Sequence, residues 1–522
     1  MFDWIQGRVR KNVAPVDTRF DVDPVPLYSP GSNEGFFSGE DVSSDLYKFG
    51  FVACINGTAE PNLSRLKMIE GWPVQAWSDW VVTHHPHTSV VFSEIAGVRL
   101  AIIGEVFDPF SKEFDSQAIA DSLCELSAQE AAFLERLDAL SGRFVVLAHH
   151  GREWFVYHDA FSSRSVYYNA HLPGAVASHA GLMAELTAEP VDFNVMSFTI
   201  SEAYRKRDVK YLPGCRTVFE KIFYCPANHR LNIFRNRAQR YWPREDASGA
   251  HDAQNAEAEL IRYLDGYSDY IRSRYDRELF GLTGGLDSRT LLAALAAKKM
   301  PMHTFTLYRG DQNGGSATDI ALARDLASSL GLEHETLKID FSRLNPEYFT
   351  ASIQIIRQNT GFARLNSAFS NAQLMSHFRG RFPGESLSYS RGFGGEILRG
   401  FYQGRTNEIH ALTAEAFSRA YDVMQGSPFV RASFQHFIDS SDFTRLHGVD
   451  VNDVFYWEHR MSGWGALAIA ETDLTARTFA GYNSRRLYRA FLQLPIEERL
   501  QRKAFKGAIS HFKPELLEFA VE

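Results

Sequence analysis

The stretch LFGLTGGLDS at residues 279–288 decides the fold of the second half of the chain. Its first four residues form a short run typical of a buried strand, and an Ala/Leu-rich segment with a helical pattern extends from Ser288 to Lys298. The two glycines between them allow backbone N–H groups to approach a ligand closely, and the N-terminus of the following helix favours anions. The order strand, glycine turn, helix therefore predicts a polyphosphate-binding loop.

Polar side chains in the same loop refine this prediction. The hydroxyls of Thr283 and Ser288 can donate to phosphate oxygens, whereas the Asp287 carboxylate would repel them. A bridging divalent cation removes that repulsion, so the loop implies Mg²⁺ and not a bare phosphate site. The sequence holds no G-x-x-x-x-G-K-[ST] motif and no G-x-G-x-x-G after a strand. A glycine turn with a polar N-cap is the alternative interpretation.

A second glycine-rich segment, GFGGEILRGFY at residues 392–402, follows the strand-like run SLSYS at residues 386–390. It again places glycines and a carboxylate, here Glu396, after a predicted strand. Ligands of open α/β sheets bind outside the carboxyl ends of the strands. We therefore expect Glu396 to belong to the same ligand site as Asp287.

These segments together resemble one protein family. Residues 283–288 resemble the pyrophosphate loop S-G-G-x-D-S of ATP pyrophosphatases, with Thr283 in place of the first serine. Residues 392–402 are similar to the segment G-E-G-x-D-E-L-F-x-G-Y of asparagine synthetases and their relatives, the β-lactam synthetases and lasso-peptide cyclases. Residues 319–335 and 482–499 are similar to two further segments of that family, in the same order along the chain. The chain is thus identified as resembling the asparagine synthetase family.

The resemblance implies an α/β pyrophosphatase domain that uses ATP and Mg²⁺. Carried over by position, Asp287 and Glu396 hold Mg²⁺, and the adenine lies against the strand from His303 to Leu307. The residues that cradle pyrophosphate are Thr283, Gly284, Gly285 and Ser288.

Two features of the chain depart from the family pattern. Phe393 and Ile397 replace two acidic residues of the second segment. The family also has a lysine followed by Leu-Arg that meets the ATP phosphates. Lys506 fits its spacing best and Lys503 is close, but neither precedes Leu-Arg. The choice between these lysines stays open, as does the interpretation of both as solvated surface residues.

The first half of the chain has a different pattern. From about residue 88 to residue 170, short runs of β-type residues alternate with turns, interrupted by one helical segment at about 115–140. Residues 137–144 and 158–168 resemble segments of the family's glutaminase domain, an α+β sandwich of antiparallel sheets with an N-terminal nucleophile. We expect this domain at residues 1–245, with its connector, and the pyrophosphatase domain with a parallel sheet at 246–522.

The glutaminase of the family uses the thiol and the α-amine of an N-terminal cysteine. This chain begins Met1-Phe2-Asp3, and its first cysteine, Cys54, is internal. We therefore expect an inactive glutaminase-like domain and no hydrolysis of glutamine. The attacking amine would then be free ammonia or an amine of the same or a second substrate.

The predicted activity is that of an ATP-dependent ligase. A substrate carboxylate is adenylated with release of pyrophosphate, and an amine displaces AMP to form an amide. Small molecules and peptides are both suitable carboxylate and amine substrates. Three alternatives stay open, namely a non-catalytic relative that binds ATP or a partner, a tRNA-modifying pyrophosphatase, and a structural scaffold.

Composition narrows the partners further. The 522 residues carry 55 Lys+Arg against 63 Asp+Glu, a net charge of −8 without a basic block, which argues against nucleic acid as a partner. No apolar run approaches the ~18 residues that span a membrane. The four cysteines lie far apart, and we expect a reducing, cytoplasmic location without a zinc site. The oligomeric state stays open, with a homodimer as one candidate.

Overall fold

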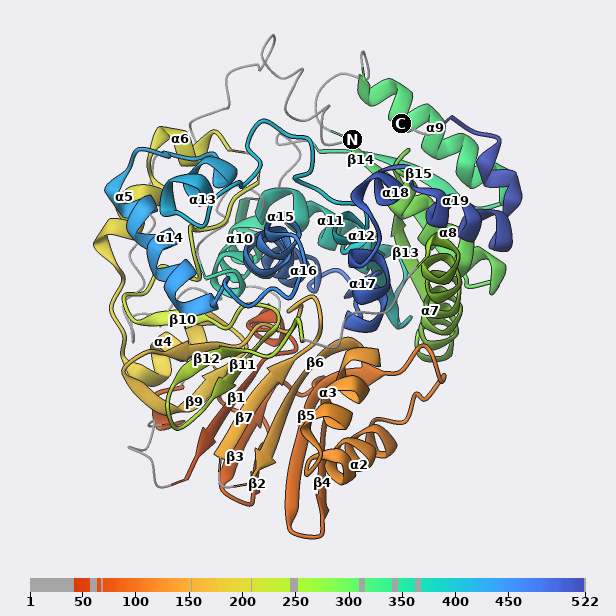
Figure 1. Ribbon diagram of the computed structural model, residues 1–522. Helices are drawn as coiled ribbons and strands as arrows, with labels where there is room; N and C mark the ends of the chain where they lie inside the picture. The colour runs from red at the N-terminus through yellow and green to blue at the C-terminus, as the bar shows by residue number, and fades with distance from the viewer. Residues whose placement is uncertain are drawn as a thin grey trace.

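Alternating apolar side chains build two antiparallel sheets in the first half of the chain (Figure 1). The structure, a computed structural model, describes residues 42–56, 63–66, 69–151, 153–207, 209–244, 252–308, 315–339, 346–361 and 368–520. The first sheet has the strand order β10-β8-β9-β1-β3-β2 and the second the order β12-β11-β7-β6-β5-β4. The strands are β1 (Phe51–Ile55), β2 (Val74–Trp77), β3 (Trp80–His84), β4 (Val90–Ile95), β5 (Val98–Phe107), β6 (Ser141–His150), β7 (Glu153–His158), β8 (Tyr167–Asn169), β9 (Leu172–Ala177), β10 (Ile222–Tyr224), β11 (His229–Asn232) and β12 (Arg237–Arg240).

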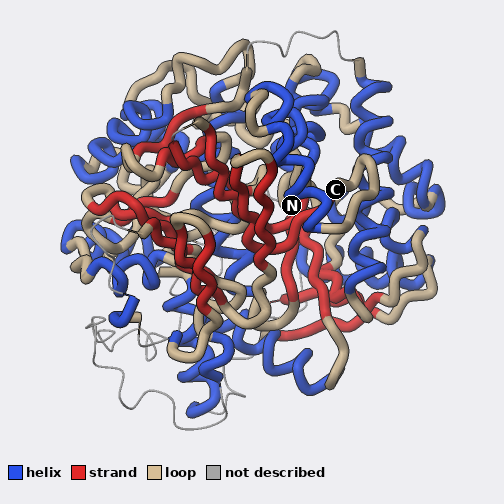
Figure 2. Tube along the Cα trace, turned by 90° about the horizontal axis from the view of Figure 1, so that it is seen from below, coloured by secondary structure: helices blue, strands red, loops and turns tan. Residues whose placement is uncertain are grey.

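The two sheets pack face to face, and Figure 2 shows them from below as layers of strands. Successive residues of a strand point to opposite faces, so every second residue enters the layer between the sheets. In β1, Phe51, Ala53 and Ile55 belong to this inner cluster, together with Trp80 of β3 and Trp154 of β7. The intervening residues of the strands pack against the helices that cover the sandwich.

A single parallel sheet organises the second half of the chain. Its order is β15-β14-β13-β16-β17, and every neighbouring pair runs parallel. These strands lie in the upper part of the view in Figure 1. Their bounds are β13 (Arg277–Gly281), β14 (Met302–Tyr308), β15 (His334–Lys338), β16 (Leu387–Arg391) and β17 (Arg477–Ala480). The central strand β13 is apolar toward both faces: Phe280 belongs to the large core cluster, and Leu279 packs with Phe305 and Phe378 on the opposite face.

Helices surround both sheet systems. In the first half they are α2 (Ser116–Leu126), α3 (Glu130–Ala139), α4 (Ala180–Thr187), α5 (Phe193–Thr199) and α6 (Glu202–Arg205). In the second half they are α7 (Ala253–Arg274), α8 (Leu286–Ala297), α9 (Gly315–Ser329), α10 (Pro346–Asn359), α11 (Ala368–Arg381), α12 (Gly395–Leu398), α13 (Ala414–Tyr421), α14 (Pro428–Ser441), α15 (Val451–Phe455), the π-helix η6 (Tyr456–Gly465), α16 (Ala466–Thr472), α17 (Arg485–Leu492), α18 (Ile496–Leu500) and α19 (Lys503–Phe512). Short 3₁₀ turns are η3 (Val42–Asp45), η4 (Leu63–Arg65) and η7 (Pro514–Leu517).

The order of the parallel strands creates a switch point. From β13 the chain proceeds outward through β14 to β15, and it then returns to place β16 on the other side of β13. The loops that leave β13 and β16 therefore diverge to opposite sides of the sheet. Ligands of α/β sheets bind at the crevice that this divergence opens at the carboxyl ends of the strands.

The predicted fold class, antiparallel sheets followed by a parallel α/β sheet, is confirmed. The helix from Ala253 to Arg274 has the expected bounds. The single helix expected at 115–140 is instead the pair α2 and α3, because the chain turns at Ser127, whose hydroxyl donates to the Leu123 carbonyl at 3.0 Å. The predicted domain boundary at residue 245 lies outside the described residues and stays a prediction. None of the described helices is long and apolar enough to cross a membrane.

Glu278 makes the stability of this sheet dependent on pH. The residue is fully buried in β13, where its carboxyl accepts hydrogen bonds from the Ser388 hydroxyl and the Ser390 N–H of β16. Burial raises its pKa from 4.5 to about 7, although those bonds lower it. Between these pH values the folded state binds more protons at Glu278 than the unfolded state, so stability falls as the pH rises through that window.

Glu278→Gln removes this titration. We expect the stability of the variant relative to the natural chain to increase from pH 5 to pH 7.5, by on the order of 1–3 kcal/mol. Unfolding midpoints of both proteins at the two pH values measure the effect. Glu125→Gln, which changes an exposed carboxylate, is the matched control and should give no such trend. A Glu278→Gln difference that stays constant with pH would contradict the assignment.

Candidate active site

The loop Thr283–Ser288 closes on itself directly after β13. Gly285 is the N-cap of α8, and the Ser288 hydroxyl donates to the Gly285 carbonyl at 3.0 Å. The hydroxyl oxygens of Ser288 and Thr283 lie 3.1 Å apart. A Cβ on Gly284 would lie 2.7 Å from the Leu322 side chain of α9, so this position has no room for a larger residue. The loop residues predicted to bind pyrophosphate are thus together at the N-terminus of a 12-residue helix.

The second glycine segment packs directly on this loop. A Cβ on Gly395 would lie 2.7 Å from the Asp287 carboxyl carbon, and one on Gly392 would lie 3.3 Å from the Ser288 nitrogen. Gly394 has φ +93°, a left-handed conformation that favours glycine, and it places the start of α12 against Asp287. The structure therefore brings Asp287 and Glu396 together, as expected from their places after two neighbouring strands.

The two carboxyl groups have different environments. Asp287 accepts from the Arg399 Nε at 3.1 and 3.3 Å. Glu396 is 6% exposed, and its Oε2 has no hydrogen-bond partner in the part of the chain that the structure describes. Burial, and next the negative charge of Asp287, raise the pKa of Glu396 to about 7. The Asp287 carboxylate in turn raises the pKa of the Arg399 guanidinium. The site thus holds two carboxyl groups and one cation in contact.

Arg399 was not among the residues predicted from the sequence. It follows Glu396 by three positions and lies one turn further along the same segment, next to Asp287. A signal was available, because an arginine stands within the segment that carries Glu396. The carboxylate that it faces, however, is more than a hundred residues earlier in the chain.

Residues 482–499 form a wall behind Asp287. The Tyr482 hydroxyl donates to the backbone carbonyl of Asp287 at 2.7 Å, and the Tyr488 hydroxyl donates to the Tyr482 carbonyl. Further along, Arg499 donates to the Ile397 carbonyl at 2.7 Å and to both oxygens of Asp453. The segment singled out in the sequence therefore buttresses both glycine loops from one side.

A buried arginine joins the pyrophosphate loop to the C-terminal segment. Arg289 donates to the carbonyl of Gly284 at 3.0 Å. It also donates to three carbonyls of the C-terminal segment, those of Leu516 at 3.2 Å, Phe519 at 3.0 Å and Ala520 at 2.6 Å. One guanidinium thereby satisfies four carbonyls and orients the loop. Sequence reasoning missed this contact, since its partners are backbone atoms more than 220 residues away.

Leu307 and the two lysines have different positions relative to the loop. Leu307 is 36% exposed near the carboxyl end of β14, the strand beside β13, as a nucleotide contact at this edge requires. Lys503 and Lys506 lie exposed on α19, which packs on α7 and α8. Neither lysine has a hydrogen bond or an ion pair within the described residues. The structure does not join either of them to Asp287 or Glu396, and their roles stay predictions.

The departures at Phe393 and Ile397 are accommodated by packing. Phe393 is buried and stacks on Phe161 of the first half, with ring centroids 5.8 Å apart. The Arg391 guanidinium covers the same ring at 4.1 Å from its centroid. Ile397 is fully buried in the core. These side chains thus replace acidic groups with apolar contacts beside the site.

The donor set fits Mg²⁺, which prefers oxygen ligands and keeps part of its shell for water and phosphate. Asp287 and Glu396 supply carboxylate oxygens, and Glu396 Oε2 is buried without a hydrogen-bond partner among the described residues. No group of three or more His, Cys, Asp or Glu that could hold a metal occurs in the described ranges. Two protein carboxylates are enough for a cation that also binds ATP phosphates.

Cys54 is buried in the middle of β1. Burial raises the pKa of its thiol to about 12, so this group is not a thiolate nucleophile. The segment Met1-Phe2-Asp3, on which the expectation of an inactive glutaminase rests, lies outside the described residues.

Comparison with known proteins bears on the second half. A model of the asparagine synthase family matches residues 279–375, which include β13, the loop at 283–288, α8 and β14. No curated protein sequence matches the chain. Among solved structures, NMN synthetase from Francisella tularensis is 16% identical over 40% of this chain and 94% of that one, with a TM-score of 0.19.

Two further solved structures are similar over part of the chain. Glutamine-dependent NAD⁺ synthetase from Acinetobacter baumannii, in complex with ADP, is 16% identical over 37% of this chain and 40% of that one, with a TM-score of 0.19. Glutamine phosphoribosylpyrophosphate amidotransferase from B. subtilis is 10% identical over 58% and 93%, with a TM-score of 0.24. Scores this low mean that little overall geometry is shared. The resemblance to the asparagine synthetase family is confirmed by the family match, over residues 279–375 of this chain.

Proposed function

We propose that the protein is an ATP-dependent ligase that forms amide bonds by adenylating a carboxylate. The asparagine synthase match supports an ATP-dependent, amide-forming ligase in general. The observation that carries the finer proposal is the contact between the two glycine loops, which sets Asp287 beside Glu396 at the carboxyl ends of β13 and β16. This is where an α/β sheet binds its ligand.

The reaction has two steps. A carboxylate oxygen of the substrate attacks the α-phosphorus of ATP, the bond to the bridging oxygen breaks, and pyrophosphate leaves an acyl-adenylate. An amine then attacks the acyl carbon, AMP leaves, and the amine loses a proton as the amide forms. Positioning and charge stabilisation are the main contributions that a protein makes to such transfers.

The residues of the chain have separate tasks in this scheme. Backbone N–H groups at Gly284 and Gly285, together with the hydroxyls of Thr283 and Ser288, bind the leaving pyrophosphate. Asp287 and Glu396 hold Mg²⁺, which when bound neutralises phosphate charge. The exposed Leu307 offers an apolar surface to adenine. One of Lys503 and Lys506 would have to turn toward the phosphates to stabilise the charge on the α-phosphate.

The amine comes from a substrate and not from glutamine. Cys54, the first cysteine of the chain, is buried with a raised pKa, and an internal cysteine has no free α-amine to act as base. Small-molecule or peptide carboxylates and amines are the proposed partners. The glutaminase-like half then serves as a support for the ligase site.

Asp287→Asn tests the reaction. Purified protein is incubated with Mg-ATP and a fractionated extract of its host, and AMP and pyrophosphate are followed by mass spectrometry. We expect AMP with the natural chain in certain fractions and a loss of at least about a hundredfold in the variant, because a neutral amide cannot replace a metal-binding carboxylate.

Asp325→Asn, at an exposed position of α9, is the matched control and should keep full turnover. Turnover retained by Asp287→Asn would refute the assignment of the site.

Arg399→Gln tests the charge balance. The guanidinium of Arg399 competes with a metal ion for Asp287, because both are held by the same carboxylate oxygens. Its removal should tighten the binding of Mn²⁺, used as a spectroscopic stand-in for Mg²⁺, by roughly tenfold. Electron paramagnetic resonance of free Mn²⁺ measures this without turnover. Arg419→Gln, at an exposed arginine, should leave the affinity unchanged, and equal affinities in all three proteins would contradict the competition.

A non-catalytic protein that binds ATP or a partner is the second candidate. The pairing of Asp287 with Arg399 favours it, since the carboxylate already has a counter-ion within the chain. The same experiment separates the two candidates. Absence of AMP in every fraction, with calorimetric binding of Mg-ATP, would select the non-catalytic protein.

A further inference from the structure

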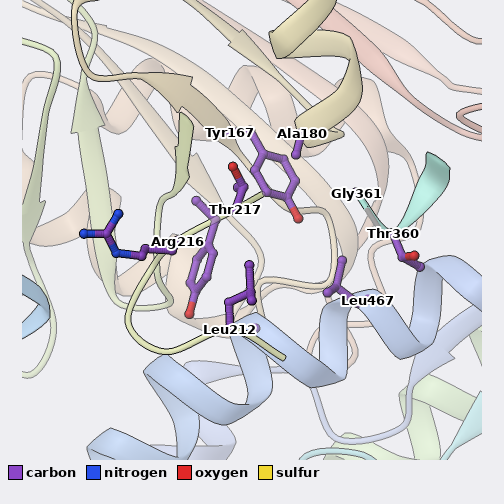
Figure 3. Close-up of a pocket in the computed structure, with 10 residues that line it drawn as sticks. Tyr167, Ala180, Leu212, Arg216, Thr217, Thr360, Gly361 and Leu467 are labelled. Carbon is purple, nitrogen blue, oxygen red and sulfur yellow. The ribbon is translucent and has the colours of Figure 1, made fainter. Parts of the chain in front are cut away.

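A small cavity lies where the antiparallel sheets meet helices of the second half. Its volume is about 10 Å³, and its walls include Arg143, Arg164, Ser178, His179, Asn359 and Leu467. A neighbouring cavity of about 20 Å³ shares Tyr167 and Leu467 with it. Figure 3 shows this neighbour, with Tyr167 on one side and Leu467 and Thr360, from elements of the second half, on the other. Both cavities therefore lie on the contact between the two halves.

The distinctive wall residue is Arg164, which is only 2% exposed. Its side-chain Nε and Nη2 have no hydrogen-bond partner in the described part of the chain. Its backbone N–H donates to Asp159 Oδ2 at 2.8 Å, but the guanidinium does not bond that carboxylate. Asp159 Oδ1 is occupied by the Ser163 N–H at 2.9 Å, the Ser163 hydroxyl at 3.0 Å and the Asn483 amide at 3.0 Å. A buried guanidinium thus faces the cavity with two unsatisfied donor atoms.

The surrounding charges leave this arginine uncompensated. Arg143 is paired with Asp473, and Arg477 is paired with Glu105 at 2.6 Å. Both arginines face Arg164, and with burial they lower its pKa well below the usual value. Burial and these arginines also keep His179 neutral, because they lower its pKa. The local excess is therefore one positive charge.

We propose that this cavity binds one small monovalent anion of halide size, held by Arg164. A buried, unpaired guanidinium is costly unless both its charge and its N–H groups are matched. One monovalent anion matches the charge, whereas a water molecule satisfies only hydrogen bonds. A cavity of about 10 Å³ has room for a single water-sized species, which excludes sulfate, phosphate and substrate carboxylates.

The bound anion would join the two halves of the chain. Arg164 and Ser178 belong to the first half, whereas Asn359 ends α10 and Leu467 lies in α16. Asn359 already contacts the first half, since its side chain accepts from the Tyr47 N–H at 2.7 Å and donates to the Asp45 carbonyl at 3.1 Å. The anion is thus a structural link between the halves and does not depend on the proposed reaction.

Thermal unfolding of the full chain tests the proposal. The protein is prepared in gluconate buffer without halide, and chloride replaces gluconate at constant ionic strength. We expect a saturable rise of the unfolding midpoint by about 2 °C, since an anion that binds only the folded state stabilises it. Bromide should act in the same way, and sulfate at equal ionic strength should not. Equal midpoints in chloride and gluconate would overturn the proposal and leave water in the cavity.

Two controls assign the effect to Arg164. Arg164→Met should abolish the dependence on chloride, whereas Arg445→Met, which removes an exposed arginine, should retain it. If Arg164→Met fails to fold, anomalous scattering from bromide-soaked crystals of the natural chain decides. A bromide peak beside the Arg164 guanidinium supports the proposal, and an empty or water-filled cavity in those crystals overturns it.

Discussion

The close approach of two glycine loops is the constraint on which the rest of the structure depends. Gly392 and Gly395 lie so near Asp287 and Ser288 that side chains at either position would collide with them or crowd them. Only backbone fills this contact, and it brings together the carboxyl ends of β13 and β16 on either side of the switch point. Two carboxyl groups and an arginine are thereby concentrated in one place, where Asp287 and Arg399 form an ion pair beside the buried Glu396.

The antiparallel half supports that contact from outside the parallel sheet. Asn483 follows Tyr482, whose hydroxyl holds the Asp287 carbonyl, and the Asn483 side chain accepts from the Phe161 N–H at 2.7 Å and donates to the Gly142 carbonyl at 2.6 Å. Phe161 also stacks on Phe393 in the second glycine segment. The first half therefore contacts both walls of the site. This gives it a structural reason to persist in a chain that does not hydrolyse glutamine.

Local patterns predicted local structure well, and long-range contacts limited the rest. The turn after residue 282 and the helix Ala253–Arg274 follow from glycine placement and helical periodicity, both properties of a few neighbouring residues. The convergence of Asp287 and Glu396 follows from their positions after strands of one sheet. Arg289 and Arg399 could not be assigned in this way, because their partners lie 112 to 231 positions away. Family spacing likewise suggested Lys503 and Lys506, but only the packing of α19 shows that both are exposed.

Buried ion pairs explain how so large an interface keeps the loops in register. Arg143 of β6 pairs with Asp473, and Arg240 of β12 bonds both oxygens of Glu458 in the π-helix. Such pairs add little net stability over apolar contacts, but removing one partner leaves a buried charge that costs several kcal/mol. A displaced interface would separate both pairs at once, so alternative packings of the two halves are strongly disfavoured. Since acyl and phosphoryl transfer depend on placement to a fraction of an ångström, this electrostatic registration is a condition for any chemistry at the glycine loops.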